Sequence, residues 1–449
     1  MAALEEAAAD AKSRGGLLRV LGVVFGVAVT VGGVIGMGIL RTPGDVAREL
    51  PGDALFIGVW VLGGLYALVG TISVAELGAA WPRSGGFYVF TRRALGEYPG
   101  FVVGWSDWLS TCGTVAAVAL VMAEYAGLLI PSLAGRTLAV ASGVAVAFAL
   151  LQWRGVRWGS RSQELTSLLK TLAFAALIAA CFAYGGGGAA ETRPAQTLSV
   201  PAGLGLLTAL VLALQGIIYT YDGWYNAIYF GEEVRDPGRN VPRAMIGSVL
   251  LVIGIYLLFN LALLYVLPVE RLAGETLAAG AAASALFGAR GDTLIRALTI
   301  VALLSAVNAL LLIATRVPFA MSRDRLFPAW AVRVNRGGTP TVALLTSALA
   351  TLLFLVSGSF NQVIAVLAFF FVANYAVSFT AVFVLRRREP DAPRPFRAWG
   401  YPWTTALALL GSLAFLAGAA ATDTRNSVYA LALLALSYPA YLLVKSRER

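Results

Sequence analysis

Two stretches of apolar sequence have the composition of helices that break in their middle. The first is Gly32-Gly33-Val34-Ile35-Gly36-Met37-Gly38, and the second is Tyr219-Thr220-Tyr221-Asp222-Gly223-Trp224. Each glycine inside a helix costs about 1 kcal/mol relative to alanine, and an aspartate near mid-membrane costs roughly 3 kcal/mol. Close helix packing is an alternative reason for the glycines, and capping of a free amide is one for Asp222. The positions of the two stretches favour breaks.

An unwound helix leaves backbone groups unpaired, and these groups can bind a solute. The amides of Gly36, Met37 and Gly38 open the second half of the first helix, where the dipole is positive and suits a carboxylate. The carbonyls of Tyr219 and Thr220 end the first half of the other helix and suit an ammonium group. A site with both features fits a zwitterionic α-amino acid.

One lysine, Lys170, stands inside the apolar run Leu168-Leu169-Lys170-Thr171-Leu172. It lies about 14 Å along its predicted helix, at 1.5 Å per residue, which is far for a side chain that must reach the interface. A charged group at such depth is a functional candidate. Burial favours the neutral form of an amine, so proton coupling through Lys170 is one hypothesis.

Other polar residues have weaker assignments. Four acidic residues lie near the predicted cytoplasmic ends of their helices: Glu76, Asp107, Glu232 and Glu233. We expect them to form salt bridges of an inner gate rather than to act in catalysis. Three hydroxyl residues of one helix either line a side-chain pocket or serve helix packing: Ser110, Thr111 and Thr114.

The composition places the chain in a membrane. Of its 449 residues 59% are hydrophobic and 13% are charged, whereas about 25% of a soluble domain is charged. Long continuous apolar runs indicate helices rather than a barrel. The chain has no histidine, and its two cysteines, Cys112 and Cys181, form no CxxC pattern. We therefore expect no metal and no cofactor.

Twelve apolar segments have roughly the length of a membrane span. They are residues 18–45, 54–80, 101–130, 136–153, 161–184, 203–230, 244–267, 292–315, 340–357, 361–385, 401–421 and 427–444. Helices 1 and 6 are an odd number of helices apart, so they cross in opposite directions, which is typical of inverted-repeat transporters. The predicted all-α membrane fold comprises a tail (1–17), a repeat of helices 1–5 (18–200), a repeat of helices 6–10 (201–386), and helices 11–12 with a tail (387–449).

The distribution of Lys and Arg predicts the orientation. With the N-terminus inside, the inner segments hold about three times as many of these residues as the outer ones. Both termini are therefore expected in the cytoplasm, with the chain in the cell's inner (plasma) membrane. The net charge of +10 then pairs with anionic lipid of the inner leaflet rather than with nucleic acid.

Several motifs follow one another in a recognisable order. They are Gly33-Val34-Ile35-Gly36-Met37-Gly38-Ile39, Ala75-Glu76-Leu77-Gly78, Pro82-Arg83-Ser84-Gly85-Gly86, Tyr221-Asp222-Gly223-Trp224, Glu232-Glu233-Val234-Arg235-Asp236-Pro237 with Arg239-Asn240-Val241-Pro242-Arg243-Ala244, and Arg394-Pro395-Phe396-Arg397 with Gly400-Tyr401-Pro402-Trp403. The ordered set, from helix 1 to helix 11, resembles the amino acid–polyamine–organocation superfamily. It is most similar to bacterial permeases related to the L-type amino acid transporters.

The resemblance implies roles for the residues of the two broken stretches. The substrate carboxylate would bind the amides at Gly36-Met37-Gly38, and the amine would bind carbonyls of Val34, Tyr219 and Asp222. Met37 stands where relatives often have serine, which leaves only its amide for the substrate. Tyr219 stands where relatives usually have a phenylalanine lid. The predicted site thus comprises Val34, Ile35, Gly36, Met37, Gly38, Tyr219, Thr220, Asp222 and Gly223, with Thr111.

The resemblance also implies a coupling role for Lys170. It matches a lysine that occupies the place of a sodium ion in sodium-coupled relatives and bridges helix 1 to helix 8. The expected partners are carbonyls near Gly32 and Gly33, with Ser305 or Asn308 on helix 8. We predict sodium-independent transport. Proton symport and amino acid exchange both remain open.

Other functions are less well supported. An enzyme needs a nucleophile–base pair, a metal site or a nucleotide cradle, and a channel needs a continuous polar lining; the sequence has no clear sign of any. A membrane sensor that binds amino acids without transport stays open. A neutral substrate is favoured over a cationic amino acid or polyamine, although Asp222 would suit a second positive charge. We expect a monomer or weak oligomer, and no partner subunit is identified.

Overall fold

The chain is described by a computed structural model that covers residues 16–185, 200–357, 360–422 and 424–446. Within these residues it consists of helices and loops, with three isolated β-bridges and no longer strand. The all-α membrane fold is therefore confirmed. Most of the predicted tail, residues 1–17, lies outside the described residues.

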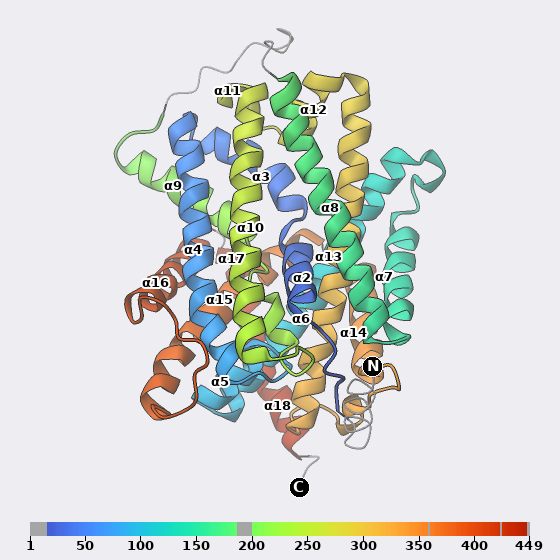
Figure 1. The fold of residues 1–449 in the computed structure, drawn as a ribbon, viewed down its shortest axis with the longest axis vertical. Coiled ribbons are helices and arrows are strands. Elements are labelled where there is room, and N and C mark those ends of the chain that lie inside the picture. The colour runs from blue at the N-terminus through green and yellow to red at the C-terminus, as the bar shows by residue number, and fades with distance from the viewer. Residues whose placement is uncertain (1–15, 186–199, 358–359, 423, 447–449) are drawn as a thin grey trace.

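Long apolar helices form the body of the molecule, and several run along its long axis (Figure 1). By length and apolar character, eight stretches of the described residues can cross a membrane, or nine if one bent pair counts as a span. They lie in α4 (Asp53–Ala80), α6 (Glu97–Leu129), α8 (Val156–Tyr184), α10 (Pro237–Val266), α13 (Ala289–Arg323), α15 (Phe360–Arg388), α16 (Trp403–Thr422), α17 (Thr424–Ala435) with α18 (Ser437–Ser446), and the pair α2 and α3.

Three of the twelve predicted spans are shorter helices: α7 (Thr137–Trp153), α9 (Leu204–Thr220) and α14 (Thr341–Val356). Each is apolar but has fewer than 18 residues, so the count of twelve stays a prediction, as does the division into repeats. The remaining helices are α5 (Phe87–Leu95), α11 (Val269–Leu272), α12 (Ala278–Phe287) and the 3₁₀ turns η1 (Pro131–Leu133), η2 (Asn226–Tyr229) and η3 (Ala329–Val332).

The predicted break in helix 1 is confirmed. Two residues separate helix α2 (Val23–Val34) from α3 (Met37–Glu49), and the two helices are bent relative to each other by 45°. Ile35 between them is extended, with φ −74° and ψ 101°. Glycines on both sides lower the cost of leaving the helix, because glycine is a poor helix former.

The predicted break in helix 6 is also present, but its second half is not an α-helix. Helix α9 ends at Thr220, and Gly223 has a φ of +100°, a left-handed conformation that favours glycine. The chain then turns into η2, a single 3₁₀ turn. The predicted segment 203–230 is thus one short helix followed by irregular backbone.

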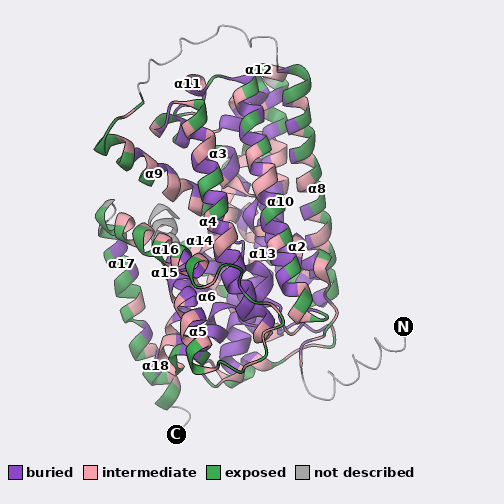
Figure 2. Cartoon of the chain, turned by 60° about the vertical axis from the view of Figure 1, so that its left-hand side comes forward, coloured by how far each residue is buried: buried purple, intermediate pink, exposed green. Residues whose placement is uncertain are grey.

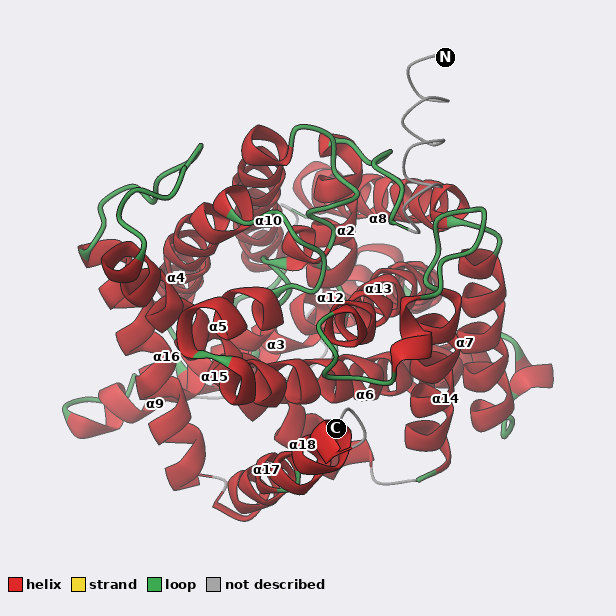
Figure 3. Ribbon diagram, turned by 90° about the horizontal axis from the view of Figure 1, so that it is seen from below, coloured by secondary structure: helices red, strands yellow, loops and turns green. Residues whose placement is uncertain are grey.

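Buried residues gather in the lower half of Figure 2, around α2, α6 and α13. Seen along the long axis, α2 and α13 lie inside, whereas α7, α14 and α17 lie at the rim (Figure 3). The rim exposes large apolar side chains, as on α8 at Leu165, Leu168, Leu169 and Leu172. Such a surface is suited to lipid rather than water.

Candidate functional site

The two breaks pack directly against each other. A Cβ added at Gly33 would lie 2.1 Å from Nδ2 of Asn226, and one added at Gly223 would lie 3.2 Å from Cγ2 of Val34. The Asn226 amide also donates to the Val29 carbonyl at 3.3 Å. Only glycine allows this approach, so the glycines of the two stretches bring two distant segments of the chain to one place.

Helix α3 and helix α9 continue this contact beyond the breaks. The hydroxyls of Thr42 and Thr220 lie 2.8 Å apart, and a Cβ at Gly38 would lie 3.0 Å from Oγ1 of Thr220. Thr220 also donates to its own helix at Gly216. Gly38 and Thr220 therefore serve helix packing as well as any role in binding.

The backbone amides that open α3 are free. Among the described residues no backbone or side-chain acceptor pairs with the amides of Gly36, Met37 or Gly38. A Cβ built on Gly36 meets nothing within 4 Å, so there is room beside these amides. The side chain of Met37 packs against an apolar cluster of α6 and α13. An anion at this place would contact backbone N–H groups at a helix start.

The carbonyls of the two breaks share one donor that sequence analysis missed. The hydroxyl of Tyr256 on α10 lies 3.0 Å from the Val34 carbonyl and 3.1 Å from the Thr220 carbonyl. One hydroxyl has one hydrogen, so it satisfies only one of these carbonyls at a time. The other is left for a second donor such as an ammonium group. A tyrosine within the apolar helix α10 was the only sequence signal.

Lys170 is fully buried and lies against the first break. Its Nζ atom is 2.9 Å from the carbonyl of Gly32 and 2.5 Å from that of Ile35. The predicted contact with helix 1 near Gly32 is confirmed. The Ile35 carbonyl therefore accepts a hydrogen bond from Lys170.

The predicted link from Lys170 to Ser305 or Asn308 is wrong. These two residues on α13 bond instead to Gln163 of α8, at 3.2 Å and 2.9 Å. Gln163 precedes Lys170 by two helical turns, or about 10 Å along the axis, so Asn308 lies at another depth. Ser305 lies nearer, since its hydroxyl also meets those of Thr166 and Ser167 at 3.2 and 3.3 Å, but the bonds of Lys170 go to α2 and the break instead. Ser167 of this polar cluster donates to the Ala28 carbonyl of α2 at 2.7 Å.

Comparison with known proteins shows the family of the chain. The family model of amino acid permeases matches residues 20–437. The chain belongs to the amino acid permease family. As a member it is a multi-pass membrane transporter of amino acids and not an enzyme. The resemblance to the amino acid–polyamine–organocation superfamily is thereby confirmed.

Individual relatives cover nearly the whole permease. The serine/threonine exchanger SteT of Bacillus subtilis is 29% identical, over 96% of this chain and 98% of the exchanger. The large neutral amino acids transporter small subunit 2 of Oryctolagus cuniculus is 30% identical, over 86% of this chain and 74% of its own. The Asc-type amino acid transporter 1 of Mus musculus is 28% identical, over 86% and 74%.

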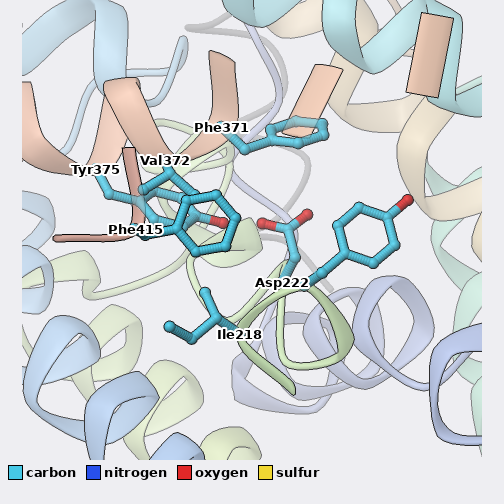
Figure 4. A pocket seen from close by; sticks show the side chains of 7 residues that line it. Ile218, Asp222, Phe371, Val372, Tyr375 and Phe415 are labelled. Carbon is cyan, nitrogen blue, oxygen red and sulfur yellow. The ribbon is translucent and has the colours of Figure 1, made fainter. Parts of the chain in front are cut away.

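Beside the second break, the permease has a small pocket between α9, α15 and α16. Its wall consists of Ile218, Tyr219, Asp222, Phe371, Val372, Tyr375 and Phe415. In Figure 4 the Asp222 carboxylate points into the space between these mostly apolar side chains. Its one hydrogen-bond donor from a described side chain is the Tyr225 hydroxyl at 3.3 Å. Tyr219 is 41% exposed.

The hydroxyls predicted on helix 3 of the permease are satisfied by their own helix. Thr111 donates to the Asp107 carbonyl at 2.7 Å and Ser110 to the same carbonyl at 3.0 Å, while Thr114 donates to Ser110. Thr111 is 2% exposed. These bonds support the packing alternative for all three residues.

Three of the four predicted inner-gate acids form salt bridges in the permease. Glu233 binds Arg316 through two hydrogen bonds of 2.9 and 2.8 Å with both side chains buried. Glu232 binds Arg323 at 2.6 Å, and Glu76 binds Arg386 and Arg394. A fourth acid, Asp324, holds Arg83 and Arg92.

The prediction for Asp107 is wrong: its carboxylate meets the Tyr229 hydroxyl instead of a cation. The reason is that Asp107 lies farther from the loops than the other three acids, in a region where aromatic side chains pack together. Phe87 packs on Tyr225 with ring centroids 4.5 Å apart and on Tyr375 at 5.9 Å. Nearer the loops, burial and the Asp324 carboxylate raise the pKa of Tyr88, whose hydroxyl donates to Asp324 at 3.0 Å.

Proposed function

We propose that this permease carries neutral L-amino acids by alternating access, without sodium. The observation that carries the proposal is the Lys170 ammonium on the carbonyls of Gly32 and Ile35. A fixed cation already supplies the positive charge that these carbonyls attract, so a sodium ion has no place there. The free amides of Gly36, Met37 and Gly38 stand one turn away along the chain and suit the substrate carboxylate.

The amine of the substrate belongs, in this proposal, at the carbonyls that Tyr256 bridges. The Val34 and Thr220 carbonyls face one hydroxyl hydrogen between them, so a bound ammonium adds the donor that is lacking. Tyr219 then covers the substrate from α9. The side chain of the substrate is selected by the pocket wall, which is largely apolar apart from Asp222.

The names of the relatives support a neutral substrate. One relative is an exchanger of serine and threonine, and another is a transporter of large neutral amino acids. We propose that this permease works as a monomer or weak oligomer in the cell's inner (plasma) membrane with both termini in the cytoplasm, since that orientation places the ion pairs of Glu76 and Glu232 on the side rich in Arg.

Competition in proteoliposomes tests the substrate class. Uptake of labelled leucine, serine or alanine is measured against excess unlabelled neutral amino acids and against arginine, in sodium and in choline buffer. We expect competition by neutral amino acids, little by arginine, and equal rates in both buffers. Strong sodium stimulation contradicts the role of Lys170, and binding without flux indicates a sensor.

A cationic substrate is the second candidate, because the Asp222 carboxylate in the pocket has no cation of its own among the described ion pairs. Dominant competition by arginine supports it. In that case Asp222→Asn should abolish arginine transport, and Glu97→Gln, which removes a carboxylate from an exposed ion pair with Lys445, should not.

A further inference from the structure

One buried acid, Asp107, is used by none of the roles described so far. It lies on α6 and is 1% exposed. Both of its carboxylate oxygens contact a single atom, the hydroxyl oxygen of Tyr229, at 2.9 and 2.8 Å. No Lys or Arg among the described residues forms an ion pair with it. An acid of this kind inside a membrane is a functional candidate.

The surrounding elements bring no free positive charge to Asp107. The titratable groups on the elements around it include Asp222, Tyr225 and Tyr229 at the second break, Tyr88 on α5, Arg316 on α13 and Tyr375 on α15. Of the other arginines, Arg92 and Arg93 on α5 pair with Asp324 and Glu389, and Arg323 on α13 and Arg386 on α15 pair with Glu232 and Glu76. Arg316 is bound to Glu233, and Tyr88 to Asp324. Helices α7 and α14 have no titratable side chain, and Lys445 on α18 is bound to Glu97 at the end of α6.

The Tyr229 hydroxyl is the donor in both contacts, and its one hydrogen can be shared between the two oxygens of an ionised Asp107. A phenol hydroxyl has one hydrogen, and an ionised carboxylate has none. Bonds between hydroxyl and carboxyl oxygens are usually 2.5–3.0 Å long, and both contacts fall in that range. A protonated Asp107 fits the same geometry, because Tyr229 then donates to one carboxyl oxygen while the other donates back to the hydroxyl. The site can therefore hold the acid with or without its proton.

Tyr229 links this acid to the gate and to the substrate site. It belongs to η2, the turn that follows the second break and packs against α2 and α13. Its ring lies 6.1 Å from that of Tyr225, and the Tyr225 hydroxyl donates to Asp222 beside the pocket. Tyr225 and Tyr229, whose rings contact each other, thus lie between Asp222 at the pocket and Asp107.

We propose that Asp107 is a proton-binding site of the transport cycle, and that an amino acid is carried inward together with a proton. The proposal rests on the proposed function and specifies its coupling ion. With the inner gate closed, Asp107 holds a proton received from the outer side past Asp222 and Tyr225. When η2 moves to open the gate, Tyr229 leaves the acid, Asp107 ionises, and the proton enters the cytoplasm.

Lys170 is less suited to this task. Its ammonium donates to two carbonyls at the break; a neutral amine keeps two hydrogens but loses the charge that strengthens both bonds. Loss of that proton in each cycle would weaken the contact that holds the break. Asp107 can gain and lose a proton while only Tyr229 moves.

The experiment uses the whole permease in proteoliposomes with labelled serine, leucine or alanine. A vesicle interior more alkaline than the outside should drive accumulation of the labelled amino acid by the wild type. A pH-sensitive dye trapped inside should report acidification of the interior when amino acid is added outside. Asp107→Asn should lower accumulation under the gradient by about ten-fold while exchange across preloaded vesicles continues. Glu97→Gln removes an acid from the same helix and should leave the gradient response unchanged.

Three results would overturn the proposal while leaving the proposed function intact. One is wild-type exchange of neutral amino acids with no response to the gradient and no dye signal. Another is an Asp107→Asn variant that responds as the wild type does. The third is a folded Asp107→Asn variant that loses both exchange and gradient-driven accumulation, since loss of both indicates a structural role. If that variant does not fold, the wild-type dye signal decides alone. Failure of the proposed function is distinct: no flux of any neutral amino acid in either assay.

Discussion

The ammonium nitrogen of Lys170 lies 2.9 Å from the carbonyl oxygen of Gly32, two residues before α2 ends. In a continuous helix the carbonyls of Gly32 and Ile35 would accept from amides four residues on. The break removes those amides, and Lys170 on another helix replaces both donors. One side chain therefore stabilises the unwound backbone beside the free amides.

Replacement of Lys170 by methionine should lower transport by about ten-fold or more, because two buried carbonyls lose their donor and each costs about 1–3 kcal/mol. Initial rates of labelled amino acid uptake in proteoliposomes measure the effect. Leu169→Met is the matched control: this neighbour is 49% exposed at the lipid-facing surface and should transport normally. Undiminished uptake by the Lys170 variant contradicts the bridging role.

A methyl group at Gly36 should weaken substrate binding without harming the fold. The Cβ position there is empty within 4 Å, so alanine clashes with no protein atom but occupies room beside the free amides. We expect KM to rise by about ten-fold. Gly58→Ala on α4, where a Cβ also meets nothing, is the control. Gly38→Leu is a poorer test, because that residue packs on Thr220. An unaltered KM for Gly36→Ala would place the carboxylate elsewhere.

Removal of the Tyr256 hydroxyl should impair transport while the ring keeps its packing. Tyr256→Phe leaves the Val34 and Thr220 carbonyls without their shared donor, and we expect a loss of about ten-fold. Uptake rates and the elution profile in detergent separate transport from folding. The control is Tyr221→Phe, which removes a buried hydroxyl that has no hydrogen-bond partner among the described residues. Equal behaviour of the two variants argues against the bridge.

The buried pair of Glu233 and Arg316 should be sensitive to loss of one partner. Glu233→Gln leaves the guanidinium without a counter-charge, and breaking such pairs costs about 3–5 kcal/mol. Arg316 also lies over the Phe230 ring at 4.7 Å. We expect a lower thermal unfolding midpoint in detergent for Glu233→Gln, and partial recovery in the double variant with Arg316→Met. A double variant less stable than the single one contradicts a simple pair.

Sequence patterns predicted both breaks and the helix that contacts Lys170. They did so because these features are local: glycines, an aspartate and a lysine stand out in apolar runs whatever the chain does elsewhere. The helical class and the family also followed from composition and ordered motifs. The 3₁₀ turn after the second break was not predictable, because residues 224–230 are apolar enough for a helix and their conformation also depends on packing against α2, α10 and α13.

Contacts between residues of different helices were the features that the sequence mainly failed to predict. Sequence spacing placed Ser305, Asn308 and Asp107 on their helices but could not set the depth at which those helices face α8 or η2. Depth follows from how each helix tilts and packs, which depends on side chains of every neighbour. The role of Tyr256 escaped for the same reason, since nothing in α10 marks which tyrosine reaches the breaks.

By its residues alone, the chain determined that it spans a membrane with helices, that two of them break, and that unpaired backbone groups are available there. Each of these properties depends on short stretches and on the cost of polar groups in lipid. Tertiary structure alone decided that the breaks touch through Gly33 and Gly223, that Tyr256 joins their carbonyls, and that Asp107 meets Tyr229 rather than an arginine. Most of those contacts join residues more than a hundred positions apart, and even Tyr256 and Thr220 are 36 apart, so only the packed bundle brings them together.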